Sequence, residues 1–170
     1  VRLELFRLVK NGKIRRVMRG IYDFPRFSEM LGQEASPDLS QVAQALARKF
    51  GWRIQPSGDT ALNFLGLSTQ VAGRIVYFSD GPDREYLIGK QPLIFQKTLL
   101  KHVALKYKET ALIVQALDVL TQQRFNSEVA KKIRSRFNDT MLKKILSDAR
   151  CVKGWIYDCI RVICLEDKSE

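Results

Sequence analysis

Apolar residues near the start of the chain recur at helical spacing and then change to the spacing of short strands. The first four share one helix face because they recur at i, i+4, i+7 and i+8. They are Val1, Leu5, Leu8 and Val9. Gly12 follows where helices commonly end in a left-handed residue. Two extended runs, residues 14–17 and 21–22, then flank the turn signal Arg19–Gly20. This order predicts a helix followed directly by a β-hairpin, the recognition helix and wing of a winged helix.

The next stretch separates this unit from a larger domain. Residues 26–37 lack periodicity and contain glycine and proline, so they are predicted to be a connector. An amphipathic helix then begins at Asp38 or Ser40, either of which can cap it, and ends at Gly51. Residues 52–55 resemble a short strand. The domain therefore opens with a helix and a strand.

A Ser-Gly turn precedes a second helix, which is predicted to be capped by Asp59 or Thr60 and to end at Gly66. Such a turn can bind a phosphate through free backbone amides. The run around Ser57–Gly58 lacks the lysine and hydroxyl placement of a nucleotide-binding loop. An ordinary helix cap is the favoured interpretation, and no chemistry is assigned to it.

A period-two pattern of β-branched and aromatic residues follows. Residues 75–78 and 86–88 flank Asp80-Gly81-Pro82-Asp83, a turn signal that predicts a hairpin, and residues 92–96 form a third strand. The carboxylates in and beside the turn are Asp80, Asp83 and Glu85. Turn chemistry accounts for both aspartates, so no metal site is predicted.

From Lys108 onward the chain is predicted to be helical. Two of these helices have N-cap residues at their starts: Asn126 or Ser127, and Asn138 or Asp139. The last apolar segment, around Trp155, fits an amphipathic helix, but its β-branched residues leave a strand open. Lysines and arginines along these helices are interpreted as solvated faces, although a second phosphate-contacting surface is an alternative.

No catalytic pattern emerges. His102 is the only histidine and has no evident partner nearby in the sequence, and no known catalytic motif is present. The cysteines are odd in number and lack zinc-site spacing, so they are predicted to be buried free thiols in a reducing cytoplasm. They are Cys151, Cys159 and Cys164. The chain is therefore predicted to be a cytoplasmic protein that is not an enzyme and has no cofactor.

Charge adds a candidate partner. The chain has a formal net charge of +11, and eight basic residues face only two acids, Glu4 and Asp23, in the first 26 residues. A clustered positive patch neutralises phosphates and releases counterions, so it indicates nucleic-acid binding; a solvated basic surface without a ligand is the alternative. The candidate DNA-binding residues are Arg2, Arg7, Lys10, Lys13, Arg15, Arg16 and Arg19.

Part of a complete winged helix is not in this sequence. Two earlier helices normally cover the apolar face of the recognition helix. Here the chain starts at Val1, within that helix, and Leu3 and Phe6 lie off its apolar stripe. The expectation is a chain shortened at its N-terminus. A second hypothesis makes it a protein–protein interaction module without sequence-specific DNA binding, in which Leu3, Phe6 and the helical tail are contact surfaces.

Three segments resemble a known family. RLVKNGKIRRVMRGIYDFP (residues 7–25) resembles the helix-to-wing segment of AbiEi-type antitoxins, from bacterial type IV abortive-infection toxin–antitoxin systems. VAQALARKFGWRIQPSGDTALNFLGLSTQV (residues 42–71) and YFSDGPDREYLIG (residues 77–89) are similar to a related branch of those proteins. The resemblance covers most of the first hundred residues.

The resemblance implies a bipartite autoregulator and antitoxin. Its winged helix would bind double-stranded DNA at inverted repeats in its own promoter, with the arginines at positions 2 and 7 and Lys10 on the recognition helix and those at 15, 16 and 19 on the wing. Its second domain would antagonise a nucleotidyltransferase-like toxin without a stable complex.

The predicted architecture is α+β with four parts. Residues 1–25 are the C-terminal half of a winged helix-turn-helix, and residues 26–37 are the connector. Residues 38–107 form a small mixed α/β domain with a β-hairpin sheet, and residues 108–170 form a C-terminal helical region.

Overall fold

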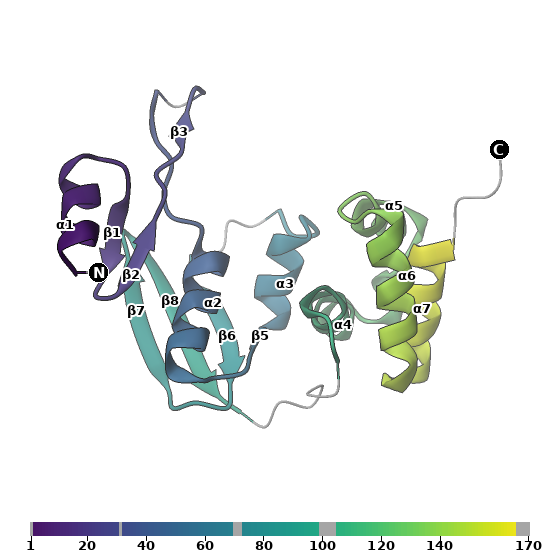
Figure 1. Ribbon diagram of the computed structural model, residues 1–170. Helices are drawn as coiled ribbons and strands as arrows, with labels where there is room; N and C mark the ends of the chain where they lie inside the picture. Colours follow the sequence, from purple (N-terminus) through teal and green to yellow (C-terminus); the bar gives the residue numbers. More distant parts are fainter. Residues whose placement is uncertain (1, 31, 70–72, 99–104, 166–170) are drawn as a thin grey trace.

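The chain folds as an α+β protein, in which a mixed sheet and a group of helices lie side by side (Figure 1). The computed structural model describes residues 2–30, 32–69, 73–98 and 105–165. In chain order its helices and strands are α1 (Arg2–Lys10), β1 (Arg15–Met18), β2 (Ile21–Asp23), β3 (Phe27–Ser28), β4 (Gln33–Glu34), α2 (Leu39–Phe50), β5 (Ile54–Pro56), α3 (Gly58–Phe64), β6 (Ile75–Ser79), β7 (Arg84–Ile88), β8 (Gln91–Lys97), α4 (Lys108–Leu120), α5 (Ser127–Arg134), α6 (Asp139–Asp148) and α7 (Gly154–Leu165).

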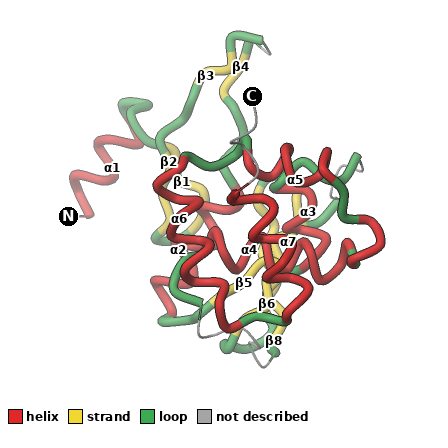
Figure 2. Tube along the Cα trace, turned by 90° about the vertical axis from the view of Figure 1, so that its right-hand side faces the viewer, coloured by secondary structure: helices red, strands yellow, loops and turns green. Residues whose placement is uncertain are grey.

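The predicted N-terminal helix and hairpin are both present. α1 ends at Gly12, whose φ of 67° is in the left-handed region. β1 and β2 pair antiparallel, with a bulge that leaves Val17 as the extra residue between the Arg16–Tyr22 and Met18–Ile21 pairs. The hairpin packs against the body of the protein through Ile21, whereas α1 projects away from it in Figures 1 and 2.

The connector contains regular structure that was not predicted. β3 and β4 pair as a second, very short hairpin, with Phe27 opposite Glu34 and Ser28 opposite Gln33. Gly32, with a φ of 61°, provides the turn conformation before β4. Figure 2 shows this hairpin standing out from the rest of the chain. Hydrophobic periodicity could not reveal it, because each strand is only two residues long and largely exposed.

The caps of α2 agree with the prediction from the sequence, but the N-cap of α3 does not. Asp38 accepts hydrogen bonds from the amides of the next helix turn, and Gly51 closes α2 with a φ of 70°. The α3 cap is Ser57, not Asp59 or Thr60 as predicted, because the Ser57 hydroxyl accepts from the Thr60 amide. The Thr60 side chain instead ties α3 to β6, since its hydroxyl oxygen accepts the Val76 amide at 3.0 Å.

The sheet corrects the predicted hairpin between residues 75–78 and 86–88. Its strand order is β5-β6-β8-β7, so β8 lies between the two strands that were expected to pair. β6 and β8 are parallel, and β7 pairs antiparallel with β8 across Gly89–Lys90, where Gly89 has a φ of 63°. The turn after β6 therefore crosses over the end of β8. Asp83 in that turn accepts the Lys97 amide at 2.7 Å, which fixes the inserted strand.

The first core lies between α2 and one face of the sheet. Phe95 of β8 is at its centre, with its ring centroid 5.5 Å from Trp52, 6.1 Å from Tyr77 and 6.0 Å from Tyr86. The buried members of this core are Ile21, Val42, Ala43, Leu46, Ile75, Tyr77, Ile88, Leu93 and Phe95. Ile21 comes from the β1–β2 hairpin, residues 15–23, which is called the wing from here on. The wing and the sheet therefore share one core.

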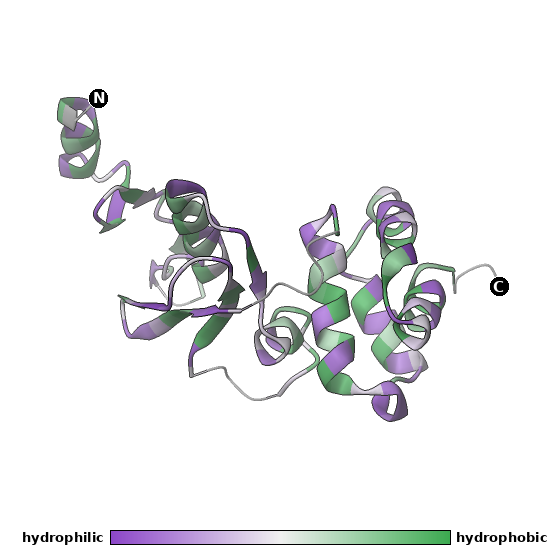
Figure 3. Cartoon of the chain, turned by 90° about the horizontal axis from the view of Figure 1, so that it is seen from below, coloured by the Kyte–Doolittle hydropathy of each residue, from purple (hydrophilic) through white to green (hydrophobic). Residues whose placement is uncertain are grey.

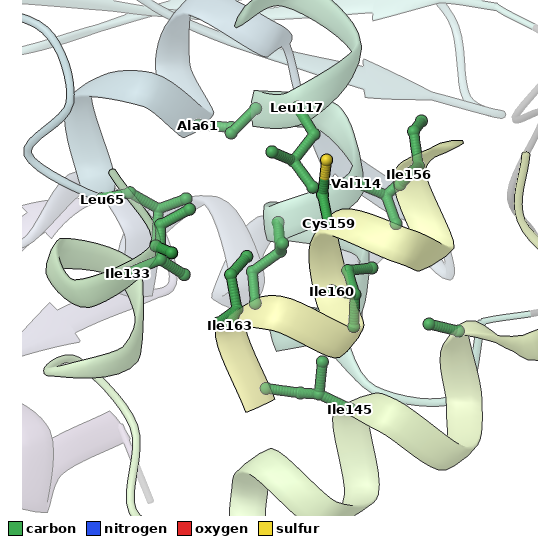
Figure 4. Packing of buried hydrophobic residues seen from close by; sticks show 14 of the residues in the cluster. Ala61, Leu65, Val114, Leu117, Ile133, Ile145, Ile156, Cys159, Ile160 and Ile163 are labelled. Atoms are coloured by element: carbon green, nitrogen blue, oxygen red, sulfur yellow. The ribbon is translucent and has the colours of Figure 1, made fainter. Parts of the chain in front are cut away.

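The second core is helical (Figure 4). α7 occupies its middle, and the segment around Trp155, for which helix and strand were both open, is helix. Ile156, Ile160 and Ile163 of α7 are almost fully buried. Ala61 and Leu65, from α3 and the residue that ends it, also belong to this core, although they precede the predicted boundary at residue 107.

Asp148 ties the start of α4 to the end of α6. Its carboxylate accepts the amides of Lys106 and Tyr107 at 2.9 and 3.0 Å. Burial raises the pKa of Asp148. The two amide bonds, the Thr110 side chain and the positive charge of Lys106 together outweigh burial, so the net pKa lies below its ordinary value of 3.8. The bonded form in the folded state is therefore the charged carboxylate.

Replacing Asp148 by alanine is expected to lower the free energy of unfolding by about 1–2 kcal/mol at pH 7, because the two amides lose their charged acceptor. The folded pKa is depressed, so this contribution is present above pH 3.8 and is lost as the pH falls through the folded pKa. Urea unfolding at pH 7 and pH 3 measures both effects. Asp158→Ala, at an exposed ion pair, is the control and should change stability little. Equal losses in the two variants would contradict the assignment.

The cysteines depart in part from the prediction. All three are free thiols; Cys159 is buried and Cys164 half-buried, but Cys151 is exposed, so its predicted burial was wrong. Burial raises the pKa of Cys164 to about 11, with Arg134 acting in the opposite direction. Among the described residues, no helix has the length and apolar character needed to cross a membrane.

Candidate nucleic-acid interface

The predicted DNA-binding residues lie on α1, on the loop after it and on the β1–β2 hairpin. Arg2 is the first residue of α1. Arg7 is exposed and forms an ion pair with Glu4 one helix turn earlier, at 3.0 Å. Lys10 is in the last turn of α1 and is also exposed. α1 thus presents basic side chains to solvent, with one of them partly neutralised by its own helix.

Arg15 differs from the other candidates, because its guanidinium is used inside the protein. Nη2 donates to Asp23 of the facing strand at 2.6 Å, and Nη1 donates to the Ala35 carbonyl at 3.0 Å. Glu34 is a second carboxylate, 3.6 Å away. With 27 % of its side chain exposed, Arg15 fastens the β1–β2 hairpin to the segment after β4. The structure therefore gives it a positioning role.

Arg15→Ala is expected to lower the free energy of unfolding by about 1–3 kcal/mol, because it removes charge-assisted hydrogen bonds and leaves the partners unpaired. Chemical denaturation of the chain and the variant measures this loss. Arg16→Ala, one residue on and exposed, is the matched control and should leave stability within about 0.5 kcal/mol. A neutral Arg15→Ala would contradict the positioning role.

Four candidate cations remain exposed along this unit. No ion-pair partner within the described part of the chain is found for any of them. They are Lys10, Lys13, Arg16 and Arg19. The bulge helps to separate them from the core, because it turns both Val17 and Met18 toward the body while Arg16 stays outside. A basic surface of this kind can contact phosphates without a cost for breaking internal bonds.

Lys49 belongs to the same surface, although sequence reasoning missed it. It lies in the last turn of α2, and its ammonium donates to the Arg19 carbonyl at 2.9 Å. The contact fixes the turn of the wing against α2. Only the basic end of α2 was visible in the sequence, and nothing there shows that it meets a turn 30 residues earlier.

The carboxylates beside the β6–β7 turn have separate structural roles. Asp80 accepts the backbone amide and Nε of Arg53, both at 2.8 Å, and these bonds hold the pKa of Asp80 below its usual range. Asp83 binds the Lys97 amide. Within the described ranges, no three metal-ligating side chains gather in one place. His102 lies outside the described residues.

Exposed apolar side chains accompany the basic ones. Leu3 and Phe6 of α1 are 74 % and 67 % exposed, and Phe24, after β2, is 75 % exposed. Figure 3 shows hydrophobic as well as hydrophilic residues around α1, which lies apart from the rest of the chain. An apolar helix surface in this position can contact another protein as well as a nucleic acid.

One known family matches this chain. Residues 1–145 match the family described as "Family of unknown function (DUF6088)", a range that runs from the basic surface into α6. Comparison with curated proteins gives no match, and neither does comparison with solved structures.

Proposed function

We propose that this chain, which belongs to the DUF6088 family of unknown function, is a cytoplasmic regulator of transcription that binds double-stranded DNA through α1 and the β1–β2 hairpin. The supporting observation is the set of exposed cations at Lys10, Lys13, Arg16 and Arg19, on a unit that is anchored to the core only through its hairpin. A protruding helix next to a basic hairpin suits a groove flanked by phosphates. In this proposal the protein is not an enzyme.

Fluorescence anisotropy with the duplex upstream of its own gene, titrated in salt against a scrambled duplex, tests the proposal. The chain should prefer its own duplex. The double variant Arg16→Ala, Arg19→Ala should reduce the slope of log affinity against log salt by about two units, because each arginine neutralises about one phosphate. The matched control replaces Arg124 and Arg150, exposed arginines of the helical part, by alanine. Equal binding to both duplexes, or an unchanged slope, would contradict the proposal.

We further propose that the regulator is an antitoxin that acts against a nucleotidyltransferase-like toxin without forming a stable complex with it. Support comes from the resemblance of residues 7–25, 42–71 and 77–89 to AbiEi-type antitoxins. Expressing the product of the neighbouring gene with and without this chain tests it: growth should stop without the chain and recover with it. Growth arrest in both cultures would overturn the antitoxin proposal and leave DNA binding untouched.

A protein–protein interaction module is the second candidate function. The exposed apolar side chains Leu3, Phe6 and Phe24 favour it. Light scattering on the chain, alone and with the product of the neighbouring gene, separates the two candidates. A defined complex that Leu3→Ser, Phe6→Ser abolishes, together with absent DNA binding, would replace the first proposal by the second.

A further inference from the structure

A cavity lies where the end of α2, the start of β5 and the start of α4 come together. Its volume is about 500 Å³, large enough for a phosphorylated ligand. Gln44 and Arg48 of α2 are among the residues that line it, and so are Lys106 and Tyr107, which come just before α4. Residues far apart in the sequence thus line a space that no sequence motif marks.

The lining of this cavity is strongly basic. Four of the residues that line it are cationic, and none is acidic. The four are Arg48, Arg53, Lys106 and Lys108. Asp80 offsets one of these charges, because its carboxylate accepts from Arg53 Nε. The Asp148 carboxylate receives the backbone amides of Lys106 and Tyr107, while the Lys106 ammonium lies 5.5 Å from the centre of the Tyr107 ring.

Cations gathered around a concave space repel one another, and a bound anion relieves that repulsion. A phosphate group suits the space, because several donors can share its oxygens and arginine matches its geometry.

Two neighbouring residues of α2 contact the turn of the wing and the cavity. Lys49 contacts the Arg19 carbonyl of the wing, and Arg48 lines the cavity. The turn of the wing and the cavity therefore both adjoin the last turn of α2.

We propose that the cavity between α2, β5 and α4 is a phosphate-binding site, in which Arg48 and Lys108 bind the phosphate oxygens. The phosphate comes from one of two sources. If it belongs to the DNA held by the wing, the site rests on the proposed function; if it belongs to a free phosphorylated ligand, the site is independent of DNA.

Isothermal titration with pyrophosphate at constant ionic strength tests the site directly. The chain should bind pyrophosphate, and Arg48→Ala or Lys108→Ala should weaken binding by about tenfold, as expected for one charge-assisted hydrogen bond. Arg124→Ala and Lys143→Ala, on exposed faces of the helical part, are the matched controls and should bind as the unchanged chain does. All four replaced side chains are exposed, so each variant should keep the fold, which circular dichroism verifies.

Two results would overturn the phosphate site. One is that pyrophosphate does not bind to the unchanged chain. The other is that the control variants weaken pyrophosphate binding as much as Arg48→Ala does, which would mean that the overall charge, and no defined site, attracts the anion.

The DNA salt titration of Arg48→Ala then identifies the source of the phosphate. A slope reduced by about one unit, with pyrophosphate competing against DNA, assigns the site to the DNA backbone. An unchanged slope, with pyrophosphate binding abolished, assigns it to a free ligand. Pyrophosphate binding without any DNA binding would contradict the proposed function and support this site. Specific DNA binding without pyrophosphate binding would support the proposed function and contradict this site.

Discussion

Replacing Phe95 by alanine is expected to lower the free energy of unfolding by about 3–5 kcal/mol, a large share of the total for a domain of this size. Its side chain is fully buried in the middle strand between β6 and β7, and three aromatic rings contact it. Removing the ring leaves a cavity that Trp52, Tyr77 and Tyr86 cannot fill without leaving their own contacts.

Urea or thermal unfolding measures the effect of Phe95→Ala, and near-ultraviolet circular dichroism reports the packing of the aromatic rings. Leu87→Ala, on the neighbouring strand but 70 % exposed, is the control and should change stability by less than about 0.5 kcal/mol. A loss below about 1 kcal/mol for Phe95→Ala, on the order of an ordinary surface change, would contradict a sheet core built around this ring.

Gly58→Ala is the second large effect, with an expected loss of about 2–3 kcal/mol from overpacking. Gly58 begins α3 where that helix crosses α4 at close range. An added Cβ would lie 2.0 Å from Val119 Cγ2, 3.0 Å from Val119 Cβ and 3.1 Å from the Gln115 carbonyl oxygen. The side chain of Val119 can rotate, but the carbonyl belongs to the α4 backbone, so the two helices must separate.

A second substitution separates this clash from a general helix effect. Val119→Ala removes the nearest atom, so the double variant Gly58→Ala, Val119→Ala should recover part of the stability that Gly58→Ala loses. Gly154→Ala, at the start of α7, adds a Cβ with nothing within 4 Å and should be neutral or slightly stabilising. If Gly58→Ala behaves like Gly154→Ala in thermal unfolding, α3 and α4 are not packed as described.

The two cores also set the geometry of the proposed interface. The sheet core includes Ile21 of the wing, and the contact between Lys49 and the Arg19 carbonyl fixes the wing turn on α2. The start of α4 and the end of α2 also come together, because Lys106 and Arg48 line the same cavity. A substitution in either core can therefore change ligand binding without contacting the ligand, which makes the stability measurements a necessary control for the binding ones.

Local signals predicted much of the secondary structure. The apolar spacing of α1, Gly12 and the turn at Arg19–Gly20 predicted the helix and hairpin, and the structure confirms both. The start of α2 was predicted at Asp38 or Ser40 and its end at Gly51, and the structure has Asp38 and Gly51 as its caps. These features depend on residues within one helix turn or one hairpin, so the sequence contains the relevant interactions.

The cap of α3 and the pairing of the sheet strands were not predicted correctly, because the local sequence allowed several equally plausible choices. Ser57, Asp59 and Thr60 can each cap a helix. In the structure the Thr60 hydroxyl accepts the Val76 amide of β6, and Ser57 accepts the Thr60 amide as the cap. The contact with Val76 is not visible in the local sequence. The turn at residues 80–83 is a good hairpin turn, but its aspartates are used by Arg53 and Lys97, and β8 enters between the strands.

The sequence by itself determined the helices, most strands, the basic N-terminal unit and the α+β class, because periodicity, caps and charge depend on residues that are close together in the sequence. Only the tertiary structure decided the strand order, the internal role of Arg15 and the cavity next to Arg48. Each of these depends on groups far apart in the chain, such as Arg15 and the Ala35 carbonyl, which lie 20 residues apart. Their pairing is a property of the packed cores, since many other long-range pairings would satisfy the same local pattern equally well.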